Sequence, residues 1–347
     1  MNREQSKDAP SAERGVALVI ALMSMALLTV LVLEFTTTMQ VELRRTDSWL
    51  AGRRARSLAE AGVKLAAQLL ELDARLSGSD TLKEPWATVL PPLATEAGTI
   101  FIRIEDEQRR LNLNRLASGV RSTDGQRFRR VLAELEIGEE LAAGVADWID
   151  RNDSVTASPP GAEVLWYAEL DPPYVPRNSG LRSFAELALI KGFNPAALRA
   201  LRPVTSVTGG STSTVNINTV SPELLRLMDP RLDDDVVVAS IVDRRKSAAL
   251  ANEDDLKAIE PLSSRLSVPR LRQLFRYSSD DFRVRATGES GGITRSVEAV
   301  LHREHGRVRI TYWLARNGPN IVGADIAVSD SPAPFDLVAG TTNTGPR

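Results

Sequence analysis

A run of about 18 residues without a charged side chain, from Val16 to Leu33, constrains this chain more than any other feature. A helix of that length spans the hydrocarbon core of a bilayer, which takes roughly 17 to 25 apolar residues. The hydrophobic segment of a secretory signal is shorter, about 7 to 15 residues, and precedes a small-residue cleavage site. Here the run is followed by Glu34-Phe35-Thr36-Thr37-Thr38. We therefore expect the apolar segment to stay on the mature protein as a membrane helix over residues 16–35.

A polar leader, residues 1–15, ends in Glu13-Arg14-Gly15 directly before the apolar run. This layout resembles a type IV prepilin, in which a peptidase on the cytoplasmic side cuts after the glycine. The resemblance implies cleavage between Gly15 and Val16 and N-methylation of Val16. The Lys and Arg count alone favours the opposite orientation, because arginines are concentrated after the span, at 44–56. We give the glycine-terminated leader precedence; the alternative is a single-pass anchor that is never processed.

The composition removes several classes of function. The 347 residues exceed the usual size of one domain, so we expect two units beyond the anchor. A net charge of -2, from 43 basic and 45 acidic residues, provides no general attraction to nucleic acid or anionic lipid. The chain has no cysteine, which excludes disulfides and thiolate sites, and only two histidines, His302 and His305, which we expect to be surface residues. No enzymatic activity and no cofactor are predicted.

Apolar spacing predicts one long helix followed by strands. Small and apolar residues recur every three or four positions from Ala51 to Leu76, where Ser77-Gly78-Ser79-Asp80 ends the pattern. A short strand is expected at 99–104, where isoleucines alternate with other residues. Three further alternating runs between Phe282 and Tyr312, separated by glycine turns, predict an antiparallel meander.

Between these strand signals the period becomes helical. Residues 123–275 read as short helices joined by Pro and Gly loops, and Ser221-Pro222-Glu223 reads as one helix start. We therefore predict an α+β fold in which a helical domain is inserted into a helix-plus-sheet host. The expected divisions are a host helix and first strand at 36–122, the insert at 123–275, host strands at 276–317 and a flexible tail at 318–347.

In the order and spacing of its motifs the chain resembles minor pseudopilin K of the bacterial type II secretion system. The motifs are Arg14-Gly15-Val16-Ala17-Leu18, Arg110-Leu111-Asn112-Leu113-Asn114, Asp147-Trp148-Ile149-Asp150, Pro172-Pro173-Tyr174, Ser183-Phe184-Ala185-Glu186-Leu187, Lys191-Gly192 and Val215-Asn216-Ile217-Asn218-Thr219. The resemblance implies a helix-hairpin-helix or SAM-like insert, an inner-membrane anchor and a periplasmic body. It also implies minor pseudopilins I and J, prepilin peptidase and the inner-membrane secretion platform as partners.

One departure from related pilins concerns the membrane helix. Most pilins carry glutamate at the fifth mature position, which here is Ile20. A carboxylate in a membrane helix is costly and is retained for a partner, which in the family is the N-terminal amine of the neighbouring subunit. We predict that Ile20 marks a subunit at the filament tip. Small residues pack helices together in lipid, and the expected helix-packing positions are Ala17, Ala21, Ser24, Leu58, Leu65 and Leu69.

Two alternative functions are considered. The segments at 189–195 and 215–219 also resemble helix-hairpin-helix modules of DNA-uptake proteins. Such modules bind phosphate through backbone amides at a Gly-rich turn, but here Pro230 removes an amide and Asp233, Asp234 and Asp235 would repel phosphate. We therefore expect no nucleic-acid binding. The second alternative is a minor pilin of a type IV pilus.

A metal site is the remaining question. Asp147, Asp150 and Asp153 follow at intervals of three, which is not the spacing of an EF-hand. We expect them to be solvated acids at a helix end. Some members of the resembled family bind calcium, so a structural ion remains open, but the sequence assigns no ligands. Trp148, Trp166, Trp313 and Tyr174 are expected to pack in the core or at an interface.

Overall fold

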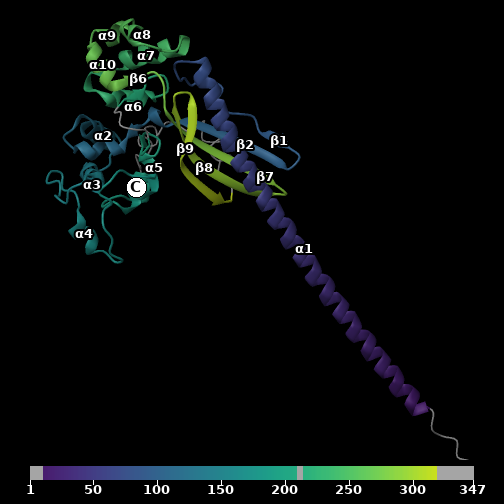
Figure 1. Ribbon diagram of the computed structural model, residues 1–347. Helices are drawn as coiled ribbons and strands as arrows, with labels where there is room; N and C mark the ends of the chain where they lie inside the picture. The colour runs from purple at the N-terminus through teal and green to yellow at the C-terminus, as the bar shows by residue number, and fades with distance from the viewer. Residues whose placement is uncertain (1–10, 209–213, 319–347) are drawn as a thin grey trace, which may run out of the picture.

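A computed structural model describes residues 11–208 and 214–318. One long helix leads into a sheet, and a group of short helices lies on the other side of that sheet (Figure 1). The helix, α1, runs over Ser11–Leu76, which is 66 residues or roughly 100 Å. It ends where the sequence predicted, at the turn that begins with Ser77. The expected tail, except for Gly318, lies outside the described residues.

The sheet has five antiparallel strands in the order β1-β2-β7-β8-β9. The strands are β1 (Leu93–Thr95), β2 (Gly98–Asp106), β7 (Asp281–Ser290), β8 (Ile293–Glu304) and β9 (Arg307–Asn317). Gly291 and Gly292 have positive φ, as have His305 and Gly306, which allows the two tight hairpins of the meander. The strand at 99–104 and the three-strand meander are thus confirmed.

The second half of α1 packs diagonally across one face of the sheet (Figure 1). The buried residues of this core are Leu58, Ala59, Val63, Ala66, Leu70, Trp86, Ile100, Ile102, Ile104, Phe282, Val284, Ala286, Val297, Ala299 and Leu301. Gly62 permits the close approach, because a Cβ there would lie 2.9 Å from the Ala286 methyl carbon. The first half of the helix, up to Leu50, is exposed throughout its described side chains.

The chain between β2 and β7 forms a second hydrophobic core of its own, which extends from Leu111 to Phe275. It therefore begins earlier than the expected boundary at 123. After η1 (Glu107–Arg109), a first group holds β3 (Leu111–Asn112), η2 (Leu113–Ser118), α2 (Thr123–Glu134), α3 (Glu140–Ile149), α4 (Val164–Ala168), η3 (Phe184–Leu189), α5 (Pro195–Leu201) and β4 (Thr205–Ser206). A second group holds β5 (Val215–Asn216), α6 (Pro222–Met228), η4 (Pro230–Leu232), α7 (Asp235–Ser247), α8 (Glu253–Lys257), α9 (Glu260–Ser263), α10 (Val268–Leu274) and β6 (Phe275–Arg276).

These two groups repeat one plan. Each begins with a short strand that pairs in parallel with the strand closing the same group, β3 with β4 and β5 with β6. In the first group the Asn114 amide accepts from the backbone of Leu181 and donates to its carbonyl and to that of Val207. In the second, Asn218 makes the same three bonds to the backbone of Leu250 and Tyr277. The helical segment is a tandem of two related units.

Candidate functional site

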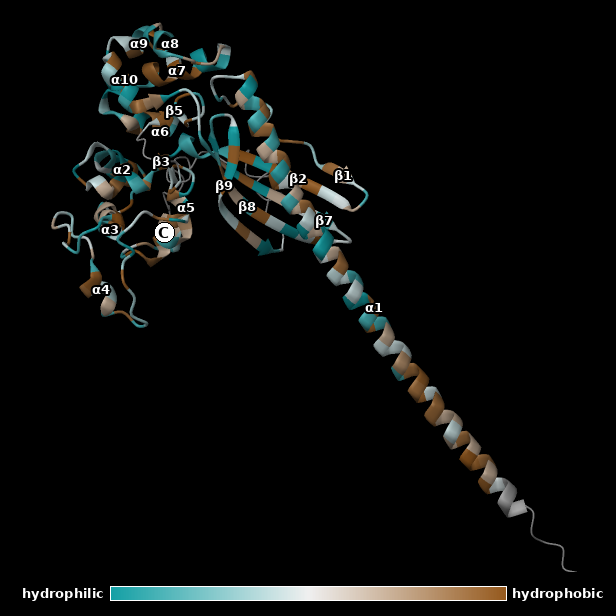
Figure 2. Ribbon diagram, in the orientation of Figure 1, coloured by the Kyte–Doolittle hydropathy of each residue, from teal (hydrophilic) through white to brown (hydrophobic). Residues whose placement is uncertain are grey.

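The membrane-side half of α1 offers a continuous apolar surface. An 18-residue window in the helix reaches a mean hydropathy of 2.9, and Figure 2 shows the hydrophobic colouring concentrated along this end. The expected residues Gly15, Val16, Ala17, Ile20, Ala21 and Ser24 are all exposed. Within the described residues nothing covers this surface, and the helix is long and apolar enough to cross a bilayer.

The second half of α1 carries an exposed apolar stripe beside its buried face. Leu65, Leu72 and Leu76 are 40%, 51% and 79% exposed, and Leu69 is half-buried against the core. Leu58 was expected to contact a partner, and this expectation is wrong, because its side chain is buried between the helix and the sheet. The outward-facing stripe is therefore Leu65, Leu72 and Leu76, with the half-buried Leu69 at its edge.

An acidic cluster joins the end of α3 to the start of α4. Asp147, Asp150 and Glu163 place one carboxylate oxygen each within 4.8 Å of the others. Asp147 is fully buried and accepts hydrogen bonds from the Thr156 amide and from Thr156 Oγ1 at 2.6 Å. The expectation of solvated acids is therefore wrong for Asp147. It holds for Asp153, whose exposed side chain accepts from Asn178.

Glu163 was not identified from the sequence, since it lies beyond the Pro159-Pro160-Gly161 loop. It is 3% exposed, and neither of its carboxylate oxygens has a hydrogen-bond partner in the described chain. Burial, with the charges of Asp147 and Asp150 nearby, raises the pKa of Glu163 to about 7. Unpaired buried carboxylate oxygens are costly, and oxygen clusters of this kind are the ligands that calcium prefers. The donor set therefore fits a bound calcium ion.

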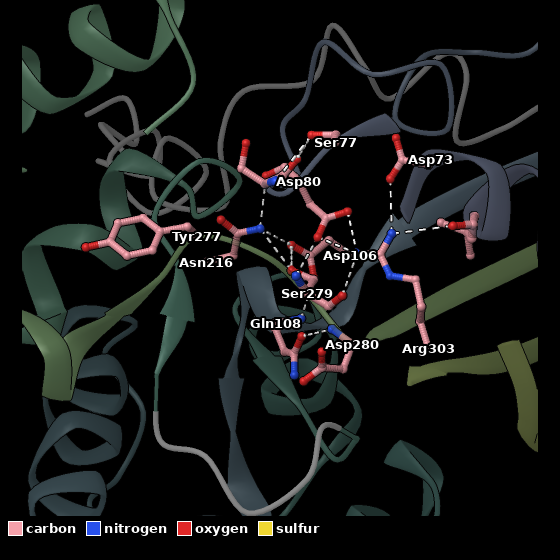
Figure 3. A network of polar contacts seen from close by, with 12 residues as sticks. Asp73, Ser77, Asp80, Asp106, Gln108, Asn216, Tyr277, Ser279, Asp280 and Arg303 are labelled. Carbon is pink, nitrogen blue, oxygen red and sulfur yellow. Dashed lines mark hydrogen bonds and ion pairs between the residues drawn. The ribbon is translucent and has the colours of Figure 1, made fainter. Parts of the chain in front are cut away.

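A buried polar network joins the helical segment to the host (Figure 3). The Asp106 carboxylate at the end of β2 accepts from Thr219 Oγ1 at 2.5 Å and Ser279 Oγ at 2.7 Å. Asn216 Nδ2 donates to the same Ser279 hydroxyl at 2.9 Å. Full burial raises the pKa of Asp106. These bonds lie where the chain leaves the sheet and returns to it, so they fix the joint between the two cores.

Arg303 on β8 extends this network to the end of α1 (Figure 3). Its guanidinium contacts Asp73 at 3.0 Å and Asp80 at 2.5 Å. With Glu84 these two aspartates form a second carboxylate group of metal-ligand spacing. The arginine already lies between two of the three, so this group functions as a structural ion-pair cluster.

The remaining predicted residues have structural roles. His302 is half-buried with Nδ1 2.8 Å from Asp281, so the surface expectation is wrong for it, whereas His305 is exposed. Asp234, which was expected to repel phosphate, caps α7 and pairs with Arg265. Trp148 is buried, whereas Trp313 is 39% exposed.

Comparisons with known proteins identify the family to which this chain belongs. Two family models, both described as "Type II secretion system (T2SS), protein K", match residues 109–210 and 215–273, the two helical units. The protein K of Pseudomonas aeruginosa is 31% identical over 70% of this chain and 75% of its own length. The chain belongs to the type II secretion system protein K family. The Aeromonas hydrophila protein K is 27% identical over 85% of this chain and 95% of that protein.

A solved structure agrees in fold. The crystal structure of the GspK-GspI-GspJ complex from enterotoxigenic Escherichia coli contains a chain similar to this one, with a TM-score of 0.70 and 19% identity. The match covers 79% of this chain and all of the other. This protein K family member is a minor pseudopilin of type II secretion, and its N-terminal apolar helix is consistent with single-pass anchoring.

Proposed function

We propose that this chain occupies the tip of the pseudopilus, where it initiates filament assembly with minor pseudopilins I and J and supports export of folded periplasmic proteins across the outer membrane. The observation that carries the proposal is the apolar surface of α1 that none of the described residues covers, which continues from Val16 through Leu33 and resumes at Leu65, Leu72 and Leu76. A mere tether needs only the membrane part. The solved relative is found in complex with GspI and GspJ, which supports I and J as partners.

The first step in the proposed assembly is removal of the leader. The chain is made as a prepilin in the inner membrane with its bulk in the periplasm, and prepilin peptidase cuts between Gly15 and Val16 before Val16 is N-methylated. Gly15 and Val16 are both exposed on α1. N-terminal sequencing of the purified protein tests this step. We expect Val16 first when the peptidase is present and residues 1–15 retained when it is absent; retention in both strains contradicts the proposal.

The tip position has two supports. Ile20 supplies no carboxylate for a neighbour above it, and the large helical segment between β2 and β7 would obstruct a subunit stacked over it. The two helical units are of the helix-hairpin-helix or SAM-like type, which their short helices and repeated Asn114 and Asn218 contacts support. The inner-membrane platform is the proposed contact of the membrane end.

We further infer that Asp147, Asp150 and Glu163 hold a structural calcium ion. The support is the pair of Glu163 oxygens that lack a partner, together with Gly161, where a Cβ would collide with the Asp147 carboxylate. The loop thus needs glycine to pass over the cluster. An ion there would tie the long loop before α4 to the end of α3.

A further inference from the structure

A groove of about 220 Å³ follows the outer edge of β2. β1 pairs only with Gly98–Ile100, so the rest of β2, Phe101–Asp106, has no strand on that side among the described residues. The opposite wall comes from the segment after α1. The groove is lined mainly by apolar side chains, which include Leu82, Trp86, Val89, Leu90 and Phe101. Val89 is 80% exposed. Such an edge presents unpaired backbone groups that can take up another extended chain.

One guanidinium at the end of the groove has no direct partner in the described part of the chain. Arg109 lines its end and makes no ion pair or side-chain hydrogen bond to any described residue. The two acids beside it are already satisfied: Glu105 pairs with Arg110 at 2.6 Å, and Asp106 is turned into the buried network. Burial and the neighbouring Arg110 lower the pKa of Arg109. Glu105 and Asp106 lie close enough to offset part of this effect, but neither forms an ion pair with Arg109. A carboxylate that enters the groove would therefore meet a guanidinium that has no direct partner among the described residues.

We propose that this groove binds an extended segment of a neighbouring pseudopilus subunit, which adds a strand to the open half of β2 and places an acidic group on Arg109. The apolar wall would accept alternate side chains of that strand. This inference rests on the proposed function, because it assumes an assembled tip.

A neighbouring subunit is the occupant that the geometry favours. Leu90 and Ala87, from the groove wall, and the half-buried Leu69 on α1 pack on the same core cluster. The groove wall and α1, the helix that we assign to assembly, therefore pack on one core. The helical units lie on the other side of the sheet (Figure 1).

Site-specific photo-crosslinking in the assembled complex tests the proposal. A photoreactive amino acid is placed at Val89 in the full chain, co-expressed with subunits I and J, and a second is placed at Leu72 in a parallel sample. We expect Val89 to crosslink to one acidic segment of I or J. Crosslinks only to a second copy of this chain, only to cargo, or to nothing would overturn the groove proposal. If Leu72 still crosslinks to I or J, the proposed function survives; if both positions fail, it falls too.

The charge part is tested in the Val89 sample with matched arginine variants. We expect Arg109→Glu to lower the Val89 crosslink at least fivefold and Arg109→Lys to keep it within twofold. Arg199→Glu, an exposed arginine on α5, is the control. The Leu72 crosslink, measured in each variant, shows whether the chain still folds and assembles. An Arg109→Glu variant with both crosslinks intact contradicts an acidic occupant.

Discussion

Ile20 is the residue on which the tip assignment depends. It lies at the fifth position after the expected cut, where the side chain is 59% exposed on α1. A carboxylate there without a partner costs about 2.5 to 3.5 kcal/mol on insertion scales. We expect Ile20→Glu to reduce membrane insertion and export at least fivefold and Ile20→Leu to have no effect. For each variant we compare the amount of secreted protein with the amount of membrane-bound subunit. Normal export by Ile20→Glu, with the variant repeated along the shaft, would show that a neighbour does receive the charge.

Glu163 makes a second prediction, on stability against pH. The pKa of Glu163 is raised to about 7 in the folded protein, so folding favours the protonated carboxyl. Its contribution to the free energy of unfolding is therefore fully present below about pH 4.5 and is lost as the pH rises through 7. In chelator we therefore expect the melting temperature to fall between pH 5 and 8. Calcium at about 100 times its Kd should add roughly 2.7 kcal/mol, or about 5 °C, at pH 7.5.

Thermal melts of Glu163→Gln provide the comparison for the calcium site. This variant should lose the calcium effect and part of the pH effect, since Asp73 keeps its own pKa of about 7 through burial and the nearby Glu84. Asp254→Asn, at an exposed acid, is the control. If calcium leaves the melting temperature of the wild-type protein unchanged, the proposed calcium site is wrong.

At the residue scale the sequence predicted the helix cap at Ser221, whose hydroxyl accepts from the Leu224 amide. It did not predict Glu163. Local spacing carries information about neighbours on one element, and the Asp147 to Glu163 contact crosses a loop whose path depends on tertiary packing. The same limit explains Asp147, which looks like a solvated acid until Thr156 and Gly161 cover it.

For the helix α1, the sequence predicted the length correctly. It did not predict which way the apolar stripe from Ala51 to Leu76 faces. The small and apolar positions on α1 recur every seven residues, as at Ala51, Leu58, Leu65 and Leu72, which corresponds to about 3.5 residues per turn, whereas a straight helix has about 3.6. The stripe therefore drifts by about 20° per heptad. Its first part, Ala51, Ala55 and Leu58, meets the sheet, and its last part, Leu72 and Leu76, faces outward. A single packing face could not be assigned without the sheet.

The outward stripe predicts a separation of stability from assembly. Leu72 is 51% exposed, so Leu72→Lys should change the free energy of unfolding by less than about 0.5 kcal/mol. It should nevertheless lower co-purification with subunits I and J at least fivefold, because the charge would enter a helix contact. Leu165→Lys, on α4 and 83% exposed, is the matched control. Equal co-purification of both variants would contradict a helix-packing role for the stripe.

For the whole molecule, sequence patterns predicted the interrupted sheet, because β2 and β7 each show clear alternation. They did not show that the helical segment is a tandem. The sequence contains two asparagine motifs, around Asn114 and Asn218, but the units differ in loop length and helix content, and it is the matching backbone contacts that relate them. The polar network that joins the helical segment to the host was not predictable either, because Asp106, Asn216 and Ser279 come together from three distant segments of the chain (Figure 3).

The central claim is that α1 packs against the corresponding helices of neighbouring subunits and does not merely anchor the protein in the membrane. Replacing residues 18–35 with an unrelated apolar span, while the leader and the Gly15–Val16 junction are kept, tests it most directly. Secreted protein is measured by activity outside the outer membrane, with the chimera matched to wild type in processing and membrane level. We expect export to fall at least tenfold and the filament to be absent. Export at the wild-type level would contradict the account.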